Sequence, residues 1–194
     1  MRQLFFSLLT IFTGLALVGC SRGPALPQAG IIELSEAFKA DFDLIDMDGN
    51  QVSDETYRGQ SMLIYFGFAS CPDVCPAALG KMSATLDALG KDAGKIQALF
   101  ITVDPERDTP EILKAHLAFD PRITGLNGTL AQATTAWTNM RVSVTKVPTP
   151  DSALAYTMSH QSMFYVIDAA GVAQVALLDD LAPKELAAAI SQHF

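Results

Sequence analysis

Residues 62–90, MLIYFGFASCPDVCPAALGKMSATLDALG, decide the fold of this chain. The apolar run at 62–68 is typical of a strand that is buried on both faces. Apolar residues then recur at helical spacing from Leu79 to Leu89, and a second apolar run, QALFITV, follows at 97–103. Strand, helix and strand in this order predict a parallel strand pair joined by a right-handed crossover.

The rest of the chain completes one α/β domain. It is predicted to contain a β-hairpin at 41–53 around Asp48-Gly49, helices from Pro110 to about 119 and over 130–140, strands at 163–168 and 172–178, and a helix over 183–190. The order is a β-hairpin, a βαβ unit, an inserted helical segment and a ββα unit. This order matches the thioredoxin-like architecture, in which a mixed central sheet carries helices on both faces. We expect residues 31–194 to form this domain.

Composition excludes several classes of protein. The chain has 194 residues, of which 49% are hydrophobic and 18% charged, so disorder is not expected. A domain of this size buries enough apolar surface to fold without disulfide bonds. The net charge is −8, and no block of Lys or Arg is present that would follow a phosphate backbone, so nucleic acid is not an expected partner.

The N-terminus reads as an export and anchoring segment. Arg2 precedes an apolar stretch at 4–18, and residues 17–20, LVGC, resemble the bacterial lipobox, in which the cysteine is lipidated. We therefore predict a lipoprotein signal peptide at 1–19, a lipid anchor on Cys20 and a tether at 20–30 rich in Gly and Pro. The domain would lie at the cell membrane on its periplasmic or extracytoplasmic side. An uncleaved spanning helix and an ordinary buried cysteine are the alternatives.

Cys71 and Cys75 carry the chemistry that the sequence indicates. They lie between a central strand and a helix, at the edge where open α/β sheets bind ligands. The helix N-terminus is expected to favour thiolate over thiol. Three residues separate the two cysteines, whereas thioredoxin-type oxidoreductases have two, so redox cycling is possible without being the default. A structural disulfide is the remaining alternative.

A metal site at this cysteine pair needs a third ligand. The sequence has no second cysteine pair, which excludes a structural zinc ribbon. His116 and His193 are in positions where a solvent-facing imidazole is expected, whereas His160 lies in a loop before a strand and should return close to the cysteines. Two thiolates and an imidazole suit Cu(I), and Cu(II) with an added oxygen ligand. Met158 is a less favoured extra ligand, because methionine more often fills packing gaps.

Four segments resemble the Sco/SenC copper proteins, and the resemblance extends over about residues 41–178. They are CPDVCP at 71–76, TVDPERDTP at 102–110, FDPR at 119–122 with Gly125-Leu126, and His160 before FYVID at 164–168. The resemblance implies a thioredoxin-like fold and copper bound by Cys71, Cys75 and His160. It also implies copper delivery or thiol reduction at the CuA site of cytochrome c oxidase subunit II.

Two positions differ from the family's usual pattern. Members commonly have Thr-His before the first cysteine and Asp before the histidine, whereas this chain has Ala69-Ser70 and Ser159. The change at Ser159 removes a carboxylate that would orient the imidazole and raise its basicity. The segment at 104–110 is interpreted as a strand exit and a helix cap, with a partner surface at Asp104 and Arg107 as the alternative.

Two functions from different classes follow. The first is a copper metallochaperone without turnover, which would act with subunit II and with another periplasmic copper chaperone. The second is an enzyme, a thiol-disulfide oxidoreductase that reduces an oxidase subunit or senses redox state and is itself recharged by a thioredoxin-like reductant. A peroxiredoxin-like peroxidase is disfavoured, because the Pro-x-x-x-Thr-x-x-Cys context of such enzymes is missing.

Overall fold

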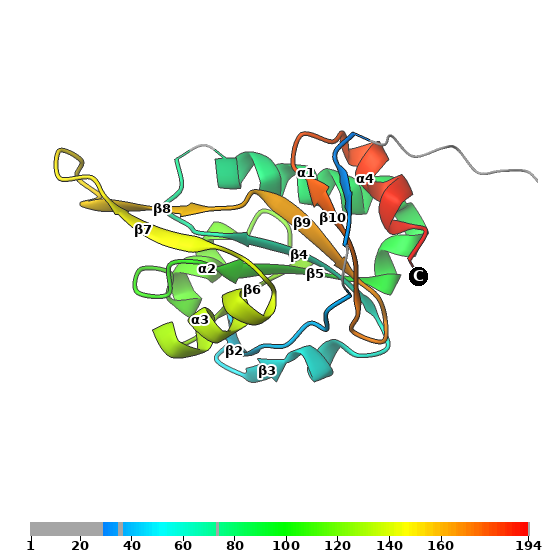
Figure 1. The fold of residues 1–194 in the computed structure, drawn as a ribbon, viewed down its shortest axis with the longest axis horizontal. Helices are drawn as coiled ribbons and strands as arrows, with labels where there is room; N and C mark the ends of the chain where they lie inside the picture. The colour runs from blue at the N-terminus through cyan, green and yellow to red at the C-terminus, as the bar shows by residue number, and fades with distance from the viewer. Residues whose placement is uncertain (1–28, 35–36, 73, 194) are drawn as a thin grey trace, which may run out of the picture.

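The computed structural model describes residues 29–34, 37–72 and 74–193. Within these residues the fold is built on an eight-stranded mixed sheet in the order β1-β10-β9-β4-β5-β6-β2-β3 (Figure 1). Its strands are β1 (Ile31–Glu33), β2 (Asp43–Asp46), β3 (Gln51–Ser53), β4 (Ser61–Gly67), β5 (Ile96–Thr102), β6 (Ile123–Asn127), β9 (Met163–Ile167) and β10 (Ala173–Leu178).

The centre of the sheet is the predicted parallel pair. Strand β4 runs parallel to β5, with Ile64 beside Leu99, and antiparallel to β9 on its other side. All seven residues of β4 are buried, which explains why its sequence is apolar without alternation. The predicted hairpin at 41–53 is also present, as β2 and β3 joined through a turn at Gly49 with a φ of 83°.

Helices cover both faces of the sheet. They are α1 (Val74–Leu89), α2 (Pro110–His116), α3 (Leu130–Asn139) and α4 (Pro183–Ile190), with 3₁₀ turns at Asp54–Tyr57 and Gly90–Lys95. Helices α1 and α4 pack together, and Figure 1 shows α3 on the opposite side of the sheet from α1. The Thr109 side chain caps α2 by accepting the Ile112 N–H, as its sequence predicts. The thioredoxin-like fold class is confirmed.

The segment between α2 and β9 differs from the prediction. Helix α2 ends at His116, and a strand, β6, follows where only helical structure was expected. Its sequence, ITGLN, is short and contains Gly125, where an added Cβ would lie 2.9 Å from Leu117 Cδ1. Strand β6 therefore depends on close packing against α2, which local sequence does not reveal.

The prediction of a loop before β9 is also wrong, because this segment forms a second β-hairpin. Strands β7 (Val144–Pro148) and β8 (Tyr156–His160) pair antiparallel, with Val144 opposite His160. Figure 1 shows this hairpin extending beyond the edge of the main sheet. Strand β7 is largely exposed, so it has none of the apolar pattern by which strands are recognised.

The predicted signal peptide and Cys20 lie outside the described residues, as does all of the tether before Ala29. Among the residues that the structure describes, no helix has the length and apolar character needed to cross a bilayer.

Candidate metal centre

The two cysteines lie where β4 passes into α1. Strand β4 ends at Gly67, where the backbone passes close to the Phe100 ring. An added Cβ at this position would lie 2.7 Å from that ring, so only glycine fits there without a shift of its neighbours. Cys71 is half-buried in the connecting loop, and Cys75 is buried in the first turn of α1. The Cys75 backbone N–H faces Cys71 Sγ at 3.4 Å. Both thiols are free.

His160 meets this pair from the last residue of β8. Its Nε2 lies 4.0 Å from Cys75 Sγ, although the two residues are 85 positions apart in the sequence. Its Nδ1 lies 2.8 Å from the Gln161 backbone carbonyl, which can only accept a hydrogen bond. Nδ1 therefore carries the proton and donates it, so that the Nε2 lone pair faces the sulfur. Burial lowers the pKa of His160, which keeps the imidazole neutral at pH 7.

Two of the three proposed ligands, Cys75 and His160, are positioned to bind the same metal ion. Typical metal–thiolate and metal–imidazole bonds add up to about 4.3 Å, so Cys75 Sγ and His160 Nε2 are close enough to bind one ion. Among the described residues, however, no group of three or more His, Cys, Asp or Glu side chains is already arranged to hold a metal. Cys71 lines a shallow pocket of about 280 Å³ together with His160, which places its side chain at the same opening as the imidazole.

The expectation that the helix N-terminus favours thiolate is wrong for Cys75. Burial is the main cause that raises the pKa of this thiol to about 12, and the neighbouring Cys71 side chain contributes to the same increase. In this setting the loss of hydration outweighs the dipole of one helix end. Cys75 is therefore a thiol at neutral pH, and a metal that binds it must displace the proton.

The other two histidines are not part of this cluster. His116 does not face solvent as expected: its ring packs against Phe100 at 6.1 Å between centroids, and burial lowers its pKa. Its Nε2 is buried without a hydrogen-bond partner in the described part of the chain. His193 is half-buried near the C-terminus, where its backbone carbonyl accepts a hydrogen bond from Ser61 Oγ.

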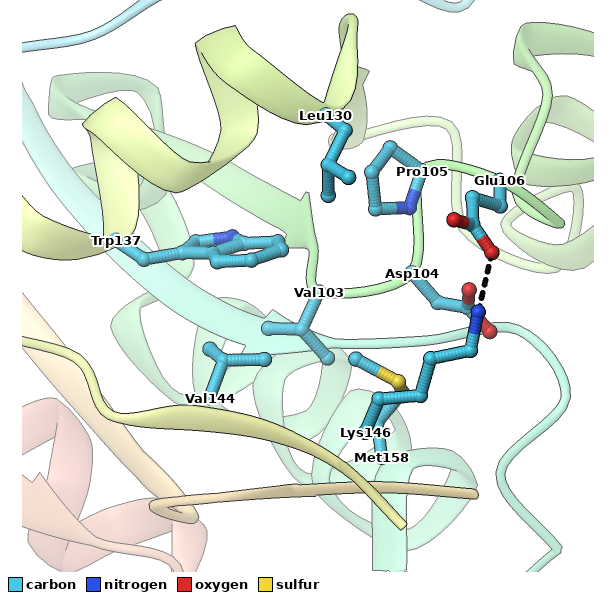
Figure 2. A pocket seen from close by; sticks show the side chains of 9 residues that line it. All are labelled: Val103, Asp104, Pro105, Glu106, Leu130, Trp137, Val144, Lys146 and Met158. Atoms are coloured by element: carbon cyan, nitrogen blue, oxygen red, sulfur yellow. Dashed lines mark hydrogen bonds and ion pairs between the residues drawn. The ribbon is translucent and has the colours of Figure 1, made fainter. Parts of the chain in front are cut away.

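Met158 lies at the border of the cysteine–histidine cluster, and its side chain also faces a second pocket. It lines the pocket of Cys71 and His160, and it also lines a second pocket of about 190 Å³ beside Val103 and Trp137. Figure 2 shows the end of its side chain near Val103, with the Lys146 side chain alongside. This placement fits the packing role that the sequence favours for Met158.

A hydrogen-bonded chain next to Cys75 was missed in the sequence. Tyr65 OH lies 2.8 Å from Ser162 Oγ, and Ser162 Oγ donates to Asp179 Oδ2 at 2.6 Å. Burial raises the pKa of Tyr65, so its hydroxyl stays protonated and donates to Ser162. These residues come from β4, the turn before β9 and the end of β10, so no sequence spacing connects them.

The fold and this cluster define a class of protein, a thioredoxin-like domain with a cysteine pair and a histidine at the end of its central strand. Within this class, the SCO1/SenC family model matches residues 32–194, and the chain belongs to the SCO1/SenC family.

Relatives and solved structures agree with this assignment. A SCO2-like protein of Rickettsia felis is 38% identical over 169 residues, which cover 85% of this chain and 82% of the relative. The structure of Bradyrhizobium japonicum ScoI with copper bound has a TM-score of 0.74 at 40% identity, and the match covers 81% of this chain and 99% of that chain. The fold of BsSco is also similar, with a TM-score of 0.65 at 23% identity, covering 84% and 96% of the two chains. BsSco has a disulfide switch and is described as a member of the Sco family of cytochrome c oxidase assembly proteins.

Proposed function

We propose that this protein binds copper through Cys71, Cys75 and His160 and supplies it to the CuA centre of cytochrome c oxidase subunit II. The observation that carries the proposal is the 4.0 Å approach of His160 Nε2 to Cys75 Sγ, with the Nε2 lone pair directed at the sulfur. Two sulfurs and one imidazole are a donor set that suits copper. The copper-bound ScoI of Bradyrhizobium japonicum, at 40% identity, supports the choice of metal.

The three ligands would have different roles in holding and releasing the ion. Cys75 and His160 belong to regular elements, α1 and β8, and are the two ligands that would stay bound during exchange. Cys71 is half-buried in a loop beside an open pocket, so an acceptor thiol can approach it. Copper would then leave stepwise, with Cys71 replaced first and the buried pair last. Binding requires both thiols to lose their protons, so affinity should increase with pH.

A second candidate is a thiol-disulfide oxidoreductase, favoured by the unequal exposure of Cys71 and Cys75. The Cys71 thiolate would attack a disulfide of the oxidase subunit and form a mixed disulfide while one partner sulfur leaves as a thiolate. The Cys75 thiolate would then attack Cys71, forming the Cys71–Cys75 disulfide and releasing the second partner thiolate. The partner gains two electrons, and a thioredoxin-like reductant would restore the pair.

Copper affinity of single variants tests the first proposal. Cys71→Ser or Cys75→Ser should abolish tight Cu(I) binding, measured by competition with a chromophoric chelator. His160→Ala should abolish Cu(II) binding and weaken Cu(I) less, because two thiolates still hold Cu(I) in a near-linear geometry whereas Cu(II) requires more nitrogen and oxygen ligands. His116→Ala is the matched control and should bind both ions as the wild type does. Full affinity in either cysteine variant would exclude this site.

Oxidase assembly in cells separates the two candidates. The His160→Ala protein keeps both thiols, so its disulfide exchange should continue. If copper delivery is the function, cells with this variant lose oxidase activity, and the loss is greatest when copper is scarce. Normal assembly at limiting copper would reject delivery and favour the reductase.

We further propose that Cys20 is lipidated after removal of residues 1–19 and that residues 20–30 tether the domain, residues 31–194, to the outer face of the cell membrane. The lipobox-like LVGC and the Gly- and Pro-containing segment after it support this arrangement.

A further inference from the structure

The hairpin that carries His160 is poorly supported by strand pairing. Within the described residues, β7 and β8 form a two-stranded sheet of their own. Two strands alone are only marginally stable in water, and four of the five residues of β7 are exposed. Other contacts must therefore hold β8, and with it His160, against the body of the domain.

Apolar packing beneath the hairpin is incomplete. The pocket of about 190 Å³ lies between hairpin residues, among them Val144 and Met158, and body residues, among them Val103 and Trp137 (Figure 2). Atoms that line a void lose the dispersion contacts they would otherwise make. The apolar part of this interface is therefore weaker than a closed core, and polar contacts become important for the position of the hairpin.

Three residues supply those polar contacts, and we call them the clamp: Asp104, Arg107 and Tyr156. Asp104, only 3% exposed, forms an ion pair with the Arg107 guanidinium. Arg107 Nη1 donates to the Tyr156 carbonyl at 3.2 Å, and the guanidinium lies 3.8 Å from the centroid of the Tyr156 ring. The Tyr156 hydroxyl donates to Asp104 Oδ1 at 2.9 Å. The clamp thus joins the start of β8 to the loop between β5 and α2 through hydrogen bonds in both directions.

An outer ion pair contributes less. Lys146 Nζ lies 2.5 Å from Glu106 Oε2, as the dashed line in Figure 2 shows, and both side chains are about half exposed. Exposed pairs of this kind contribute about 0–1 kcal/mol. The buried carboxylate of Asp104 is the stronger element, because it accepts charge-assisted hydrogen bonds from both Arg107 and Tyr156 away from water.

The same loop also holds the cysteine side of the site. Asp108 Oδ2 accepts the Ala69 backbone N–H at 3.0 Å, two residues before Cys71. The Phe68 carbonyl accepts the Cys71 N–H at 3.2 Å, and the Phe68 ring lies edge-on to the His160 ring at 6.2 Å between centroids. A single loop, 104–109, is therefore bonded to the segment before the cysteines and to the strand that ends at the histidine.

We infer that Asp104, Arg107 and Tyr156 are positioning residues that keep His160 within ligand distance of the cysteine thiols. The inference rests on the proposed copper function. Functional groups from distant segments must be held to about 0.5 Å to act together, and Cys75 and His160 belong to segments that share no strand pairing. None of the bonds of the clamp involves a cysteine thiol or the imidazole, so the clamp would act on copper indirectly, through the hairpin and through the Phe68 ring, whose centroid lies 5.9 Å from the Arg107 guanidinium.

Asp104→Asn and Tyr156→Phe test the clamp. Asp104→Asn weakens the ion pair, and Tyr156→Phe removes only the hydroxyl while keeping the ring under Arg107. Asp120→Asn is the matched control, because Asp120 is 5% exposed and its carboxylate is bonded to Arg122 and Ser83, neither of which belongs to the clamp. In copper-free protein, nuclear Overhauser contacts between the His160 ring and the Phe68 and Tyr65 rings report the position of the histidine.

The expected result is specific to the clamp variants. The ring contacts of His160 should weaken or disappear in these variants. Their Cu(II) affinity should fall about tenfold, which corresponds to about 1.4 kcal/mol. The nitrogen hyperfine signal of the bound Cu(II), measured by electron paramagnetic resonance, should weaken with it. Their Cu(I) affinity, which depends mainly on the thiols, should change less than about threefold. Asp120→Asn should lower the melting temperature and leave the ring contacts, the Cu(II) affinity, the nitrogen hyperfine signal and the Cu(I) affinity unchanged. If Asp104→Asn fails to fold, Tyr156→Phe still tests the hydroxyl bond.

The two proposals fail in different ways. If the wild type bound no copper, the proposed function would be wrong, while the ring contacts would still test the clamp. If the wild type bound copper and both clamp variants matched Asp120→Asn in ring contacts and in Cu(II) signal, the clamp would be rejected and the copper function retained.

Discussion

The imidazole of His160 is oriented by a backbone carbonyl. Its Nδ1–H donates to the Gln161 carbonyl, and the residue before it is Ser159, where family members commonly have Asp. A carbonyl fixes the tautomer as a carboxylate would, but it adds less basicity to the ring because it carries no charge. The Asp179 carboxylate, hydrogen-bonded to Ser162, is close enough to raise the pKa of His160 slightly against the larger effect of burial.

Cys75 should be the slower of the two thiols to react with iodoacetamide. A pKa of about 12 leaves far less thiolate at pH 8 than an ordinary thiol near 8.5 has. The higher intrinsic nucleophilicity of a basic thiolate recovers part of that loss, so the net expectation is about a hundredfold slower alkylation than for an ordinary thiol. Peptide mapping by mass spectrometry at timed intervals measures each cysteine separately.

The pH dependence of this reaction checks its cause. Because the thiolate fraction of Cys75 grows until the pH passes its pKa, its alkylation rate should still be rising between pH 9 and 11. In urea-unfolded protein Cys71 and Cys75 should react at similar rates. A Cys75 rate in folded protein that levels off near pH 8 would show that burial does not raise its pKa.

At the scale of elements, the segment at 104–110 has two structural tasks. Thr109 and Pro110 begin α2, as the sequence predicts. Asp104 and Arg107, which the sequence left as an alternative partner surface, are instead engaged with Tyr156 of β8. The helix cap explains the residue types at the end of this segment, and the contact with the β7–β8 hairpin explains those at its beginning.

Removing the cap of α3 should destabilise the domain by about 1 kcal/mol. Thr129 Oγ1 accepts the Gln132 N–H at 3.3 Å, and α3 carries Trp137, whose indole N–H donates to the Thr102 carbonyl at 3.0 Å. Thr129→Ala leaves a helix N–H without its partner. Urea unfolding followed through Trp137, the single tryptophan, measures the change in free energy.

Thr138→Ala is the control for this cap. Thr138 is exposed in α3 and its hydroxyl donates back to the Thr134 carbonyl within the same helix, so alanine should be neutral or slightly stabilising because of its higher helix propensity. Equal losses in Thr129→Ala and Thr138→Ala would mean that the loss at Thr129 is not due to the cap.

At the scale of the whole molecule, the core explains why the thiols are free for chemistry. Large side chains of β4, β5 and β9, among them Tyr65, Phe66, Phe100 and Phe164, are fully buried. A domain with such a core does not need a disulfide for stability. Cys71 and Cys75 can therefore bind an ion or exchange electrons without unfolding the protein.

Cys20→Ser should release the protein from the membrane while the domain stays folded. The proposed anchor and the core are separate segments, so the loss of a lipid chain should not change packing. The measurements are partition into the detergent phase of Triton X-114 and labelling with a fatty-acid analogue, with the melting temperature as a test of folding. Continued membrane attachment that resists salt would instead indicate that residues 4–18 remain as a spanning helix.

Local sequence determined much of this protein. The strands β4 and β5, the β2–β3 hairpin at Asp48-Gly49, the cap of α2 and the position of the cysteine pair were all predicted correctly. Each depends on residues within about ten positions of one another, through apolar periodicity, turn chemistry or capping. Such features leave the same pattern in any chain that contains them.

Only the tertiary structure decided the remaining features. The burial of His116, the raised pKa of Cys75 and the 4.0 Å distance between His160 and Cys75 arise between segments far apart in sequence, although the sequence did predict that His160 lies near the cysteines. The β7–β8 hairpin is local in sequence, but its first strand is mostly exposed and has no apolar pattern. Strand pairing of a mostly exposed segment depends on its partner, and a pKa depends on how much water the surrounding residues exclude. Both are properties of neighbours in space, so neither can be read from the residues that stand beside a position in the chain.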